Sequence, residues 1–443
     1  MKKLWLVLAV IGCLGLATVA QTELPADVQA WVNNIRAKYA GVTIRVSATP
    51  HPSIEAFKAM TPEFTALTGI KVEYDEVGPV ELRQQHFVAH TAGTGVFDVL
   101  MTDGFWIEEY ALKGVIEPLR PYLEDPELTP AWFDWEDILP AYRETISSVY
   151  GEPYGVVTAG ESRFIAYRKD LFEKYGICPP KTTEDLLEVA KFFNGREPGL
   201  YGFATRAARG IYFSSGWLHI LYQFSDGWID QKTGKVIADT PPVIESLEYW
   251  VELLRQGPPD IAVYTHEEAS SAFMAGKVAL WFEATAIAGW LIDPAKSKVY
   301  DKVGFLPPPY GPNGWYGGLA GWNFAISSDS RNKGAAWAYI VWMTSRFNAK
   351  KYLAHGGVEN RLSVLQDPEI TSRHPELYEA LLKTFEAAAN LAKKGMKWIP
   401  PTWLSFGVLD IMGDYGNMAL TGELTPEEAC KRGAAELRAL FGQ

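Results

Sequence analysis

Cysteine is scarce in this chain of 443 residues, which holds three. Cys13 lies in an N-terminal apolar run, so only Cys178 and Cys430 remain for the body of the protein. No Cys/His cluster has the spacing of a zinc site, and we predict no metal centre. In an oxidising compartment, Cys178 and Cys430 could form a disulfide or remain as two separate thiols. Two separate buried thiols is the simpler prediction.

Positive charge is also in short supply. The chain has 41 basic and 53 acidic residues, a net charge of -12, and an acidic surface repels phosphate backbones. We therefore expect no nucleic-acid partner. With 48% hydrophobic and 21% charged residues, disordered and collagen-like classes are excluded as well.

Long hydrophobic runs are missing after the first twenty residues, so we expect no membrane-spanning helix in the mature protein. The N-terminus carries Lys2 and Lys3 before an apolar run that ends at Ala20, which is typical of an export signal. Val10-Ile11-Gly12-Cys13 inside that run offers an alternative, lipidation of Cys13. Cleavage after Ala20 is favoured, giving a periplasmic protein, whereas an acylated Cys13 would anchor it to the outer face of the cytoplasmic membrane.

Nucleophile-elbow, P-loop, zinc-protease and dinucleotide motifs are absent, and so is any short repeat period. We therefore predict no cofactor. In contrast, aromatic residues are plentiful, with 16 Trp, 21 Tyr and 21 Phe. So many indoles indicate a surface that stacks on a ligand.

The first part of the chain alternates strand and helix patterns. Residues 42–49, 70–74 and 97–101 read as strands, and residues 53–67 and 81–92 as the helices between them. This β-α-β-α-β order predicts a layered α/β domain with a mainly parallel sheet.

Similar signals recur further along. Capping boxes, formed by Thr182 with Asp185 and by Thr425 with Glu428, predict helices that begin at Thr182 and Thr425. Further helices are predicted from Pro241 and over 267–275, and a strand over 278–282. Two proline- or glycine-containing stretches, Gly151–Val157 and Val303–Pro309, read as chain crossings between bodies.

Several segments together resemble a known family. They are Phe97-Asp98-Val99-Leu100-Met101, Gly114-Val-Ile-Glu-Pro-Leu119, Tyr167-Arg168-Lys169-Asp170-Leu171 with the following Pro179-Pro180-Lys181-Thr182, Phe273-Met-Ala-Gly-Lys-Val-Ala-Leu-Trp281 and Val303-Gly-Phe-Leu-Pro307. From about residue 42 to 440 the chain is similar to the family 1 extracellular solute-binding proteins of bacterial ABC importers. The segments 48–62 and 281–285 look most like the sugar and polyol binders.

The resemblance implies an α/β protein of the two-lobed periplasmic-binding-protein fold (type II), with the ligand cleft between the lobes. Residues 41–155 and 304–355 would form lobe 1, and residues 156–303 and 356–443 lobe 2. The implied partners are a carbohydrate or polyol ligand and the transmembrane subunits of an ABC permease, served by a monomer that closes around its ligand.

A sugar needs an aromatic plate and short polar groups that donate and accept. Candidate ligand-binding residues at strand ends and near the predicted crossings are Trp322, Asn323, Glu161, Ser162, Glu283, Trp281 and Asp103. Further candidates are Arg206, Arg361, Trp217 and His51; of Arg206 and Arg209, we expect one to donate to ligand hydroxyls. The run around Arg209 departs from the Gly-Trp-Gly-Glu-Asn pattern of polyol-type relatives, which leaves the particular ligand open.

An alternative from another class is a secreted glycoside hydrolase that uses Glu161 and Glu283 as acid and nucleophile. Strands and helices do not alternate eight times, as a barrel would require, so the binding protein is the favoured reading and no catalytic residue is assigned.

Overall fold

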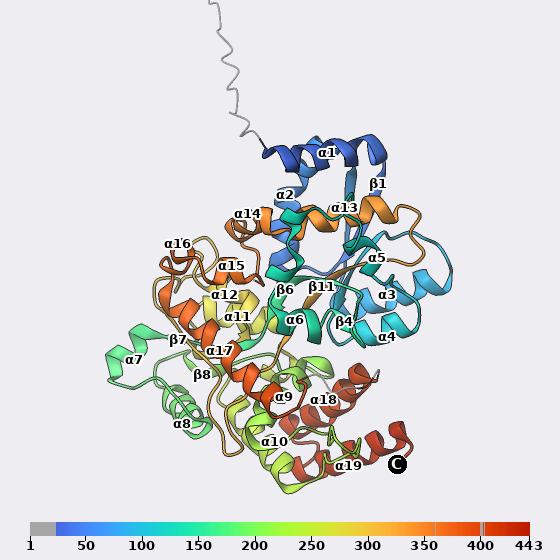
Figure 1. The fold of residues 1–443 in the computed structure, drawn as a ribbon. Coiled ribbons are helices and arrows are strands. Elements are labelled where there is room, and N and C mark those ends of the chain that lie inside the picture. Colours follow the sequence, from blue (N-terminus) through green and yellow to red (C-terminus); the bar gives the residue numbers. More distant parts are fainter. Residues whose placement is uncertain (1–23, 359, 399–401, 403) are drawn as a thin grey trace, which may run out of the picture.

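The computed structural model describes residues 24–358, 360–398, 402 and 404–443. Two α/β lobes follow one another from top to bottom in Figure 1. Cys13 and Ala20 lie outside the described residues, so cleavage and lipidation remain predictions. No helix within the described ranges has the length and apolarity needed to cross a bilayer.

Lobe 1 is built on a five-stranded sheet in the order β2-β1-β3-β11-β6. Strand β1 pairs in parallel with β2 and β3, and β11 runs in the direction opposite to the other four strands, pairing antiparallel with β3 and β6. The predicted β-α-β-α-β unit and the mainly parallel sheet are therefore confirmed. The strands are β1 (Thr43–Ala48), β2 (Lys71–Glu76), β3 (Val99–Asp103), β6 (Val156–Glu161) and β11 (Ala320–Ile326).

Helices cover this sheet because their apolar faces need a partner. In the first helix after β1, Ile54, Phe57, Met60 and Phe64 are buried, and the helix ends at Gly69, whose φ of 77° is left-handed. The helices associated with lobe 1 are α1 (Ala26–Tyr39), α2 (Pro52–Thr68), α3 (Pro79–Thr91), α4 (Ile107–Leu112), α5 (Arg120–Leu123), α6 (Pro140–Thr145), α13 (Lys333–Thr344), α14 (Ala349–Ala354), α15 (Leu362–Leu365) and α16 (Pro368–Thr371).

Lobe 2 has a four-stranded sheet in the order β10-β7-β9-β8. Its strands are β7 (Arg163–Arg168), β8 (Tyr201–Ala204), β9 (Val278–Ala284) and β10 (Val303–Leu306). Its helices are α7 (Lys169–Tyr175), α8 (Thr183–Phe193), α9 (Ile211–Phe224), α10 (Pro241–Leu254), α11 (His266–Met274), α12 (Ala288–Leu291), α17 (Pro375–Lys393), α18 (Ser405–Thr421) and α19 (Pro426–Phe441). The capping boxes at Thr182 and Thr425 that predicted two of these helices are both present.

The chain changes sheets later than the sequence suggested. Residues 152–153 form β5 (Glu152–Pro153), which pairs with β4 (Ser148–Val149), and β6 then joins the sheet of lobe 1. Strand β10 pairs with β7 in lobe 2. Helices α15 and α16 pack with α14 of lobe 1 through Val364, Ile370 and Ala349. We therefore propose lobe boundaries at Ser162, between Leu306 and Ala320, and after α16, in place of 155/156, 303/304 and 355/356.

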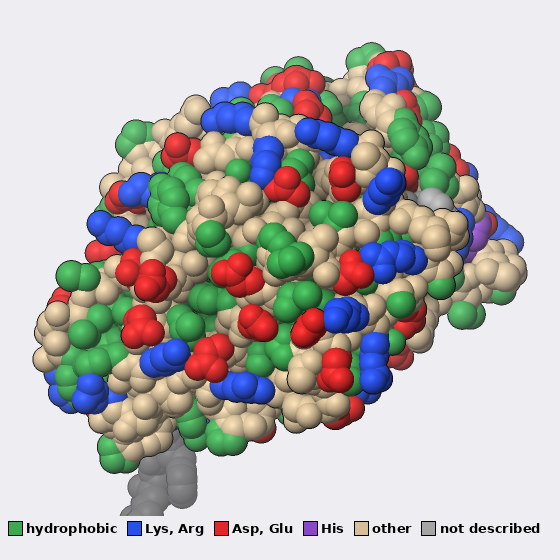
Figure 2. All heavy atoms as spheres, turned by 90° about the horizontal axis from the view of Figure 1, so that it is seen from below, with side chains coloured by type: hydrophobic (Ala, Val, Ile, Leu, Met, Phe, Trp, Pro, Cys, Tyr) green, Lys and Arg blue, Asp and Glu red, His purple; other side chains and the backbone are tan. Residues whose placement is uncertain are grey.

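Most of the abundant tryptophan lies in the core. Seven indoles are among the largest fully buried side chains: Trp106, Trp217, Trp228, Trp250, Trp281, Trp337 and Trp342. The surface is of a different character. Figure 2 shows the face seen from below, where Asp/Glu and Lys/Arg side chains are interspersed with small hydrophobic groups, as on a solvated surface.

The two remaining cysteines do not pair. Cys178 is exposed and Cys430 is buried in α19, and both are free thiols. Burial raises the pKa of Cys430 to about 12, so this thiol stays protonated and inert. The simpler prediction, two separate thiols, is confirmed, although only one of them is buried.

Candidate ligand-binding cleft

A cleft with about 1040 Å³ of empty space, counting its open mouth, is lined by residues of both lobes. Lobe 1 contributes the end of β3, the end of β6, the start of β11 and the N-terminus of α2. Lobe 2 contributes the loop after β8 and the first turns of α9 and α11. This two-sided construction suits a small molecule held between lobes.

On the lobe 1 side, a histidine and a carboxylate form a pair. His51 caps α2: its Nδ1 accepts a hydrogen bond from the Ser53 N–H at 3.1 Å. The ring proton of the neutral imidazole therefore sits on Nε2, which lies 2.9 Å from Oε1 of Glu161. The second oxygen of Glu161 has no hydrogen-bonding partner in the described part of the chain, which leaves an oriented acceptor at the cleft wall.

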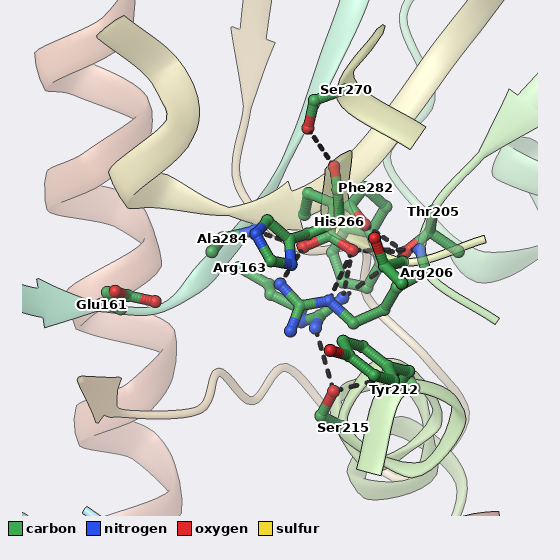
Figure 3. A network of polar contacts seen from close by, with 12 residues as sticks. Glu161, Arg163, Thr205, Arg206, Tyr212, Ser215, His266, Ser270, Phe282 and Ala284 are labelled. Atoms are coloured by element: carbon green, nitrogen blue, oxygen red, sulfur yellow. Dashed lines mark hydrogen bonds and ion pairs between the residues drawn. The ribbon is translucent and has the colours of Figure 1, made fainter. Parts of the chain in front are cut away.

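On the lobe 2 side, two arginines surround one buried carboxylate. Glu283, in β9, is fully buried, and Arg206 donates to both of its oxygens, from Nε at 2.7 Å and from Nη2 at 2.5 Å. Arg163, the first residue of β7, adds a contact at 3.4 Å. Figure 3 shows Arg163 and Arg206 converging in this cluster while Glu161 lies apart on its own strand.

The electrostatics of this cluster follow from its burial. Burial alone would raise the pKa of Glu283, but the positive charges of Arg163 and Arg206 hold it well below its ordinary value. Burial lowers the pKa of Arg163 to about 9. The two formal positive charges of Arg163 and Arg206 are matched in number by Glu283 and Glu161, so these four residues carry no excess positive charge that would favour an anionic ligand.

Asp103, at the end of β3, differs from these groups. It accepts a hydrogen bond from the Phe105 N–H at 2.9 Å, yet burial, followed by the nearby charge of Glu161, raises its pKa to about 7. A carboxyl group that is half protonated near neutral pH can donate as well as accept a hydrogen bond.

This shift makes a prediction about stability. Between pH 4 and pH 7 the native state holds the Asp103 proton that the unfolded chain has lost, so stability falls as pH rises through this window and is level above it. Asp103→Asn has no such titration. The free energy of unfolding of the variant minus that of wild type should therefore be more positive at pH 8 than at pH 5, by on the order of 1 kcal/mol. Urea denaturation at both pH values measures this; an unchanged difference would contradict it.

The aromatic part of the cleft consists of indoles and phenyl rings from both lobes. Trp322 is half-buried at the start of β11, and its ring packs edge to face on Trp106 with centroids 5.6 Å apart. The aromatic lining is completed by Trp290, Trp398, Phe105, Tyr212 and Phe406. Flat apolar faces beside hydroxyl-binding groups fit the C–H faces of a sugar or polyol.

Six of the predicted site residues line this cleft: His51, Asp103, Glu161, Ser162, Arg206 and Trp322. Arg209 does not; its side chain is half exposed and lies near Glu423. Ser162 occupies the crossing between the sheets, where its hydroxyl donates to the Gly318 carbonyl at 2.5 Å.

The other predicted residues lie away from the cleft. Asn323 follows Trp322 in a strand, so its side chain faces the opposite side; it is buried and bonded to Ser147 and to the Ile146 carbonyl. Glu283 is sequestered behind Arg206. These placements favour structural roles for both residues.

Trp217, Trp281 and Arg361 are likewise core residues. Both indoles are fully buried, and Trp217 donates its N–H to Ser246. Arg361 is 2% exposed and donates to the carbonyls of Thr344 and Asp134. None of the three lines the cleft, and the polar groups of Trp217 and Arg361 are already used inside the protein, so nothing here supports ligand binding.

Several cleft residues escaped the sequence analysis, among them Trp106, Arg163, Tyr212, Ser215, His219, His266 and Trp398. Trp106 and Arg163 carried a usable signal, since each lies within three residues of a strand end where Asp103 or Glu161 was selected. Trp398 had none, because a loop near the C-terminus reaches the cleft only through tertiary folding.

Comparisons with known proteins agree with this geometry. The family model described as bacterial extracellular solute-binding protein matches residues 48–349. The solved structure of an ABC transporter solute-binding protein from Agrobacterium radiobacter in complex with ribitol superposes with a TM-score of 0.84 and 25% identity, covering 91% of this chain and all of that one. The predicted two-lobed α/β fold is thereby confirmed.

Two curated relatives carry names of different ligand classes. The chain is 29% identical over 341 residues to the erythritol/L-threitol-binding protein of Mycolicibacterium smegmatis, covering 72% of this chain and 70% of the relative. It is 26% identical over 348 residues to a probable amino-acid ABC transporter periplasmic-binding protein of Sinorhizobium fredii, covering 76% and 77%. The choice between these ligand classes therefore depends on the site itself.

Proposed function

Because the chain belongs to the family of bacterial extracellular solute-binding proteins, we propose that it is the substrate-binding subunit of an ABC importer for a neutral sugar or sugar alcohol. It captures this ligand between its lobes and delivers it to the membrane permease. Relatives and structural neighbours that bind erythritol, threitol and ribitol support this assignment.

The observation that carries the proposal is the pairing of Trp322 with the His51–Glu161 couple in one cleft. The indole offers a flat apolar face, and the free oxygen of Glu161 accepts from a hydroxyl. An amino acid would instead need a dedicated carboxylate clamp, but two nitrogens of the Arg206 guanidinium are already bound to Glu283.

The same contacts argue against hydrolysis. A glycosidase needs a protonated acid and a second carboxylate on either side of the scissile bond. Glu283 has both oxygens bound by Arg206 and a pKa well below its ordinary value, since Arg163 and Arg206 offset the effect of burial. It therefore cannot be the acid, and its burial keeps it from acting as a nucleophile. We propose that the ligand is released unaltered.

A thermal-shift panel tests the proposal. Erythritol, ribitol, D-mannitol and neutral sugars should include at least one compound that raises the melting temperature, because ligand at 100 times its Kd adds ~2.7 kcal/mol of stability. Sugar phosphates should give no shift, because the formal charges in the cleft balance, and amino acids should give none, because Arg206 is already bound to Glu283. A larger shift with a charged compound, or product formation from an intact glycoside, would overturn the assignment.

A further inference from the structure

Glu283 lies behind Arg206 and Ala284, which both line the cleft, and the protein itself holds both of its oxygens. Oε1 accepts from the backbone N–H of Arg206 at 3.0 Å and from Nε of the same residue at 2.7 Å. Oε2 accepts from Nη2 of Arg206 at 2.5 Å and from the Ala284 N–H at 3.0 Å. The main chain and the side chain of Arg206 thus bind one carboxylate, which fixes the direction in which the guanidinium points.

Arg206 uses only one edge of its guanidinium for this contact. The Nε/Nη2 edge binds Glu283, whereas both N–H bonds of Nη1 and the second N–H bond of Nη2 have no partner in the described chain. Glu283 has no exposed surface, but 18% of the Arg206 side chain is exposed. Nη1 is not among the buried unpartnered atoms of the described residues. The Nη1/Nη2 edge is therefore accessible from the cleft.

A second group with unused hydrogen-bonding capacity lies on the lobe 1 side of the same cleft. Glu161, at the end of β6, binds His51 through Oε1 and leaves its other oxygen without a partner in the described residues. Its charge acts on Arg206, yet no hydrogen bond joins these two side chains in the described chain, and Figure 3 shows Glu161 apart on its own strand. An acceptor in lobe 1 and a donor edge in lobe 2 are thus left for a group bound between them.

We infer that Glu283 is a positioning residue for ligand binding: it holds Arg206 so that the Nη1/Nη2 edge donates to two hydroxyls on adjacent carbons of the ligand. One of these hydroxyls donates its own proton to the free oxygen of Glu161, because a hydroxyl donates and accepts at the same time. A ligand held in this way bridges lobe 2 to lobe 1. This inference rests on the proposed function and specifies the ligand as one that carries a vicinal diol.

This arrangement favours a neutral diol over other groups. A carboxylate matches the shape of a guanidinium edge, but it would bring a negative charge beside Glu283 and Glu161, and the charge of Arg206 is already paired with Glu283. It also has no proton to donate to Glu161. An ammonium group would face the N–H donors and the positive charge of Arg206. A pair of adjacent hydroxyls meets the requirements of both lobes without adding a charge.

Calorimetric titration with the polyol that gives the largest thermal shift among erythritol, ribitol and D-mannitol tests the role of Arg206. Arg206→Lys keeps a positive charge beside Glu283 but has no planar edge, so its affinity should fall about 10-fold or more. Arg209→Lys is the matched control, because this side chain is half exposed beside Glu423 and does not line the cleft. Its affinity should stay within about twofold of wild type. Equal affinity in Arg206→Lys and wild type overturns the inference and leaves the proposed function intact.

Glu283→Asp tests the positioning role. The aspartate keeps the negative charge beside Arg163 and Arg206 but is one methylene shorter, so the guanidinium either moves back from the cleft or loses one of its two bonds. Affinity per folded molecule should fall about 10-fold, although the residue itself touches no ligand. Urea denaturation gives the folded fraction that this comparison needs. Wild-type affinity in folded Glu283→Asp would mean that the carboxylate only stabilises the fold, and it overturns the inference.

A third measurement is made on the wild-type protein. In protein labelled with ¹⁵N-arginine, saturating polyol should slow both the rotation of the Arg206 Nη1 group and the exchange of its protons with water, so that its signal becomes resolved. The Nε–H, which is bound to Glu283 with or without ligand, should shift little. An Nη1 signal that does not change on saturation overturns the inference. Should none of the three polyols bind, the proposed function fails first, and the inference fails with it.

Discussion

Glu283→Gln should lower the free energy of unfolding by about 3–5 kcal/mol, because it removes one partner of a buried ion cluster and leaves the others uncompensated. Arg163 and Arg206 would then both be buried without their shared counter-charge. In addition, a glutamine NH₂ would face a guanidinium donor where a carboxylate oxygen now accepts. Urea denaturation at pH 7 measures the loss directly.

Glu161→Gln is the matched comparison. The same chemical change is made at the cleft surface, where the carboxylate binds only His51 within the described chain. Its cost to stability should be about 1 kcal/mol, and its main effect should be a loss of ligand affinity of ~1–3 kcal/mol. Similar stability for the two variants, with affinity lost only in Glu283→Gln, would return Glu283 to the role of a ligand contact.

The stability that the Glu283 carboxylate contributes depends on pH, and the sign of this dependence follows from its pKa. The pKa of Glu283 is depressed in the native state by Arg163 and Arg206, against the effect of burial. The stability it contributes is therefore present above the pKa of an unfolded glutamate, ~4.3, and is lost as pH falls below that value. Consequently, the gap in stability between wild type and Glu283→Gln should narrow when the pH is lowered from 7 to 3.

The elements of lobe 1 were predictable because their signals are local. Alternation identified β1 and β2, a one-sided apolar face identified α2, and Gly69 marked its end. The capping boxes at Thr182 and Thr425 worked for the same reason, since a cap is decided within a few residues. Fold class therefore followed from the sequence together with the resemblance.

The crossing point could not be predicted in this way. Gly155 and Pro153 gave the stretch before β6 the composition of a linker. What places β6 in lobe 1 is its pairing with β11, in which Ala159 lies opposite Trp322. Such a long-range partner leaves no local signature in either segment.

The site was half predictable for a related reason. The expectation that polar residues at strand ends face the cleft identified Asp103 and Glu161, but it also selected Glu283. The sequence shows where a strand ends, but it does not show which side chains fill the space beyond that end. Here two arginines occupy that space. The number of tryptophans did not predict the size of a ligand-stacking surface either, because indoles such as Trp217 and Trp281 fill the core of lobe 2.

Trp322→Ala should weaken ligand binding by ~1–3 kcal/mol, or roughly 5- to 150-fold, while the protein remains folded. The ring is only half-buried and stands at the cleft, in contact with Trp106 and near His51. Its removal takes away stacking area that the ligand would use and opens no cavity in the core. Calorimetric titration with the best ligand of the thermal panel gives the affinity, and urea denaturation gives the stability.

Trp217→Ala provides the contrast, because it deletes the same side chain from a fully buried position in α9. A large-to-small change of this kind costs about 3–5 kcal/mol of stability, and ligand affinity per folded molecule should change little. If Trp322→Ala instead behaves like Trp217→Ala, with stability lost and affinity preserved, the indole at the start of β11 is a packing residue. The aromatic plate would then have to be Trp290, which lines the cleft and is partly exposed.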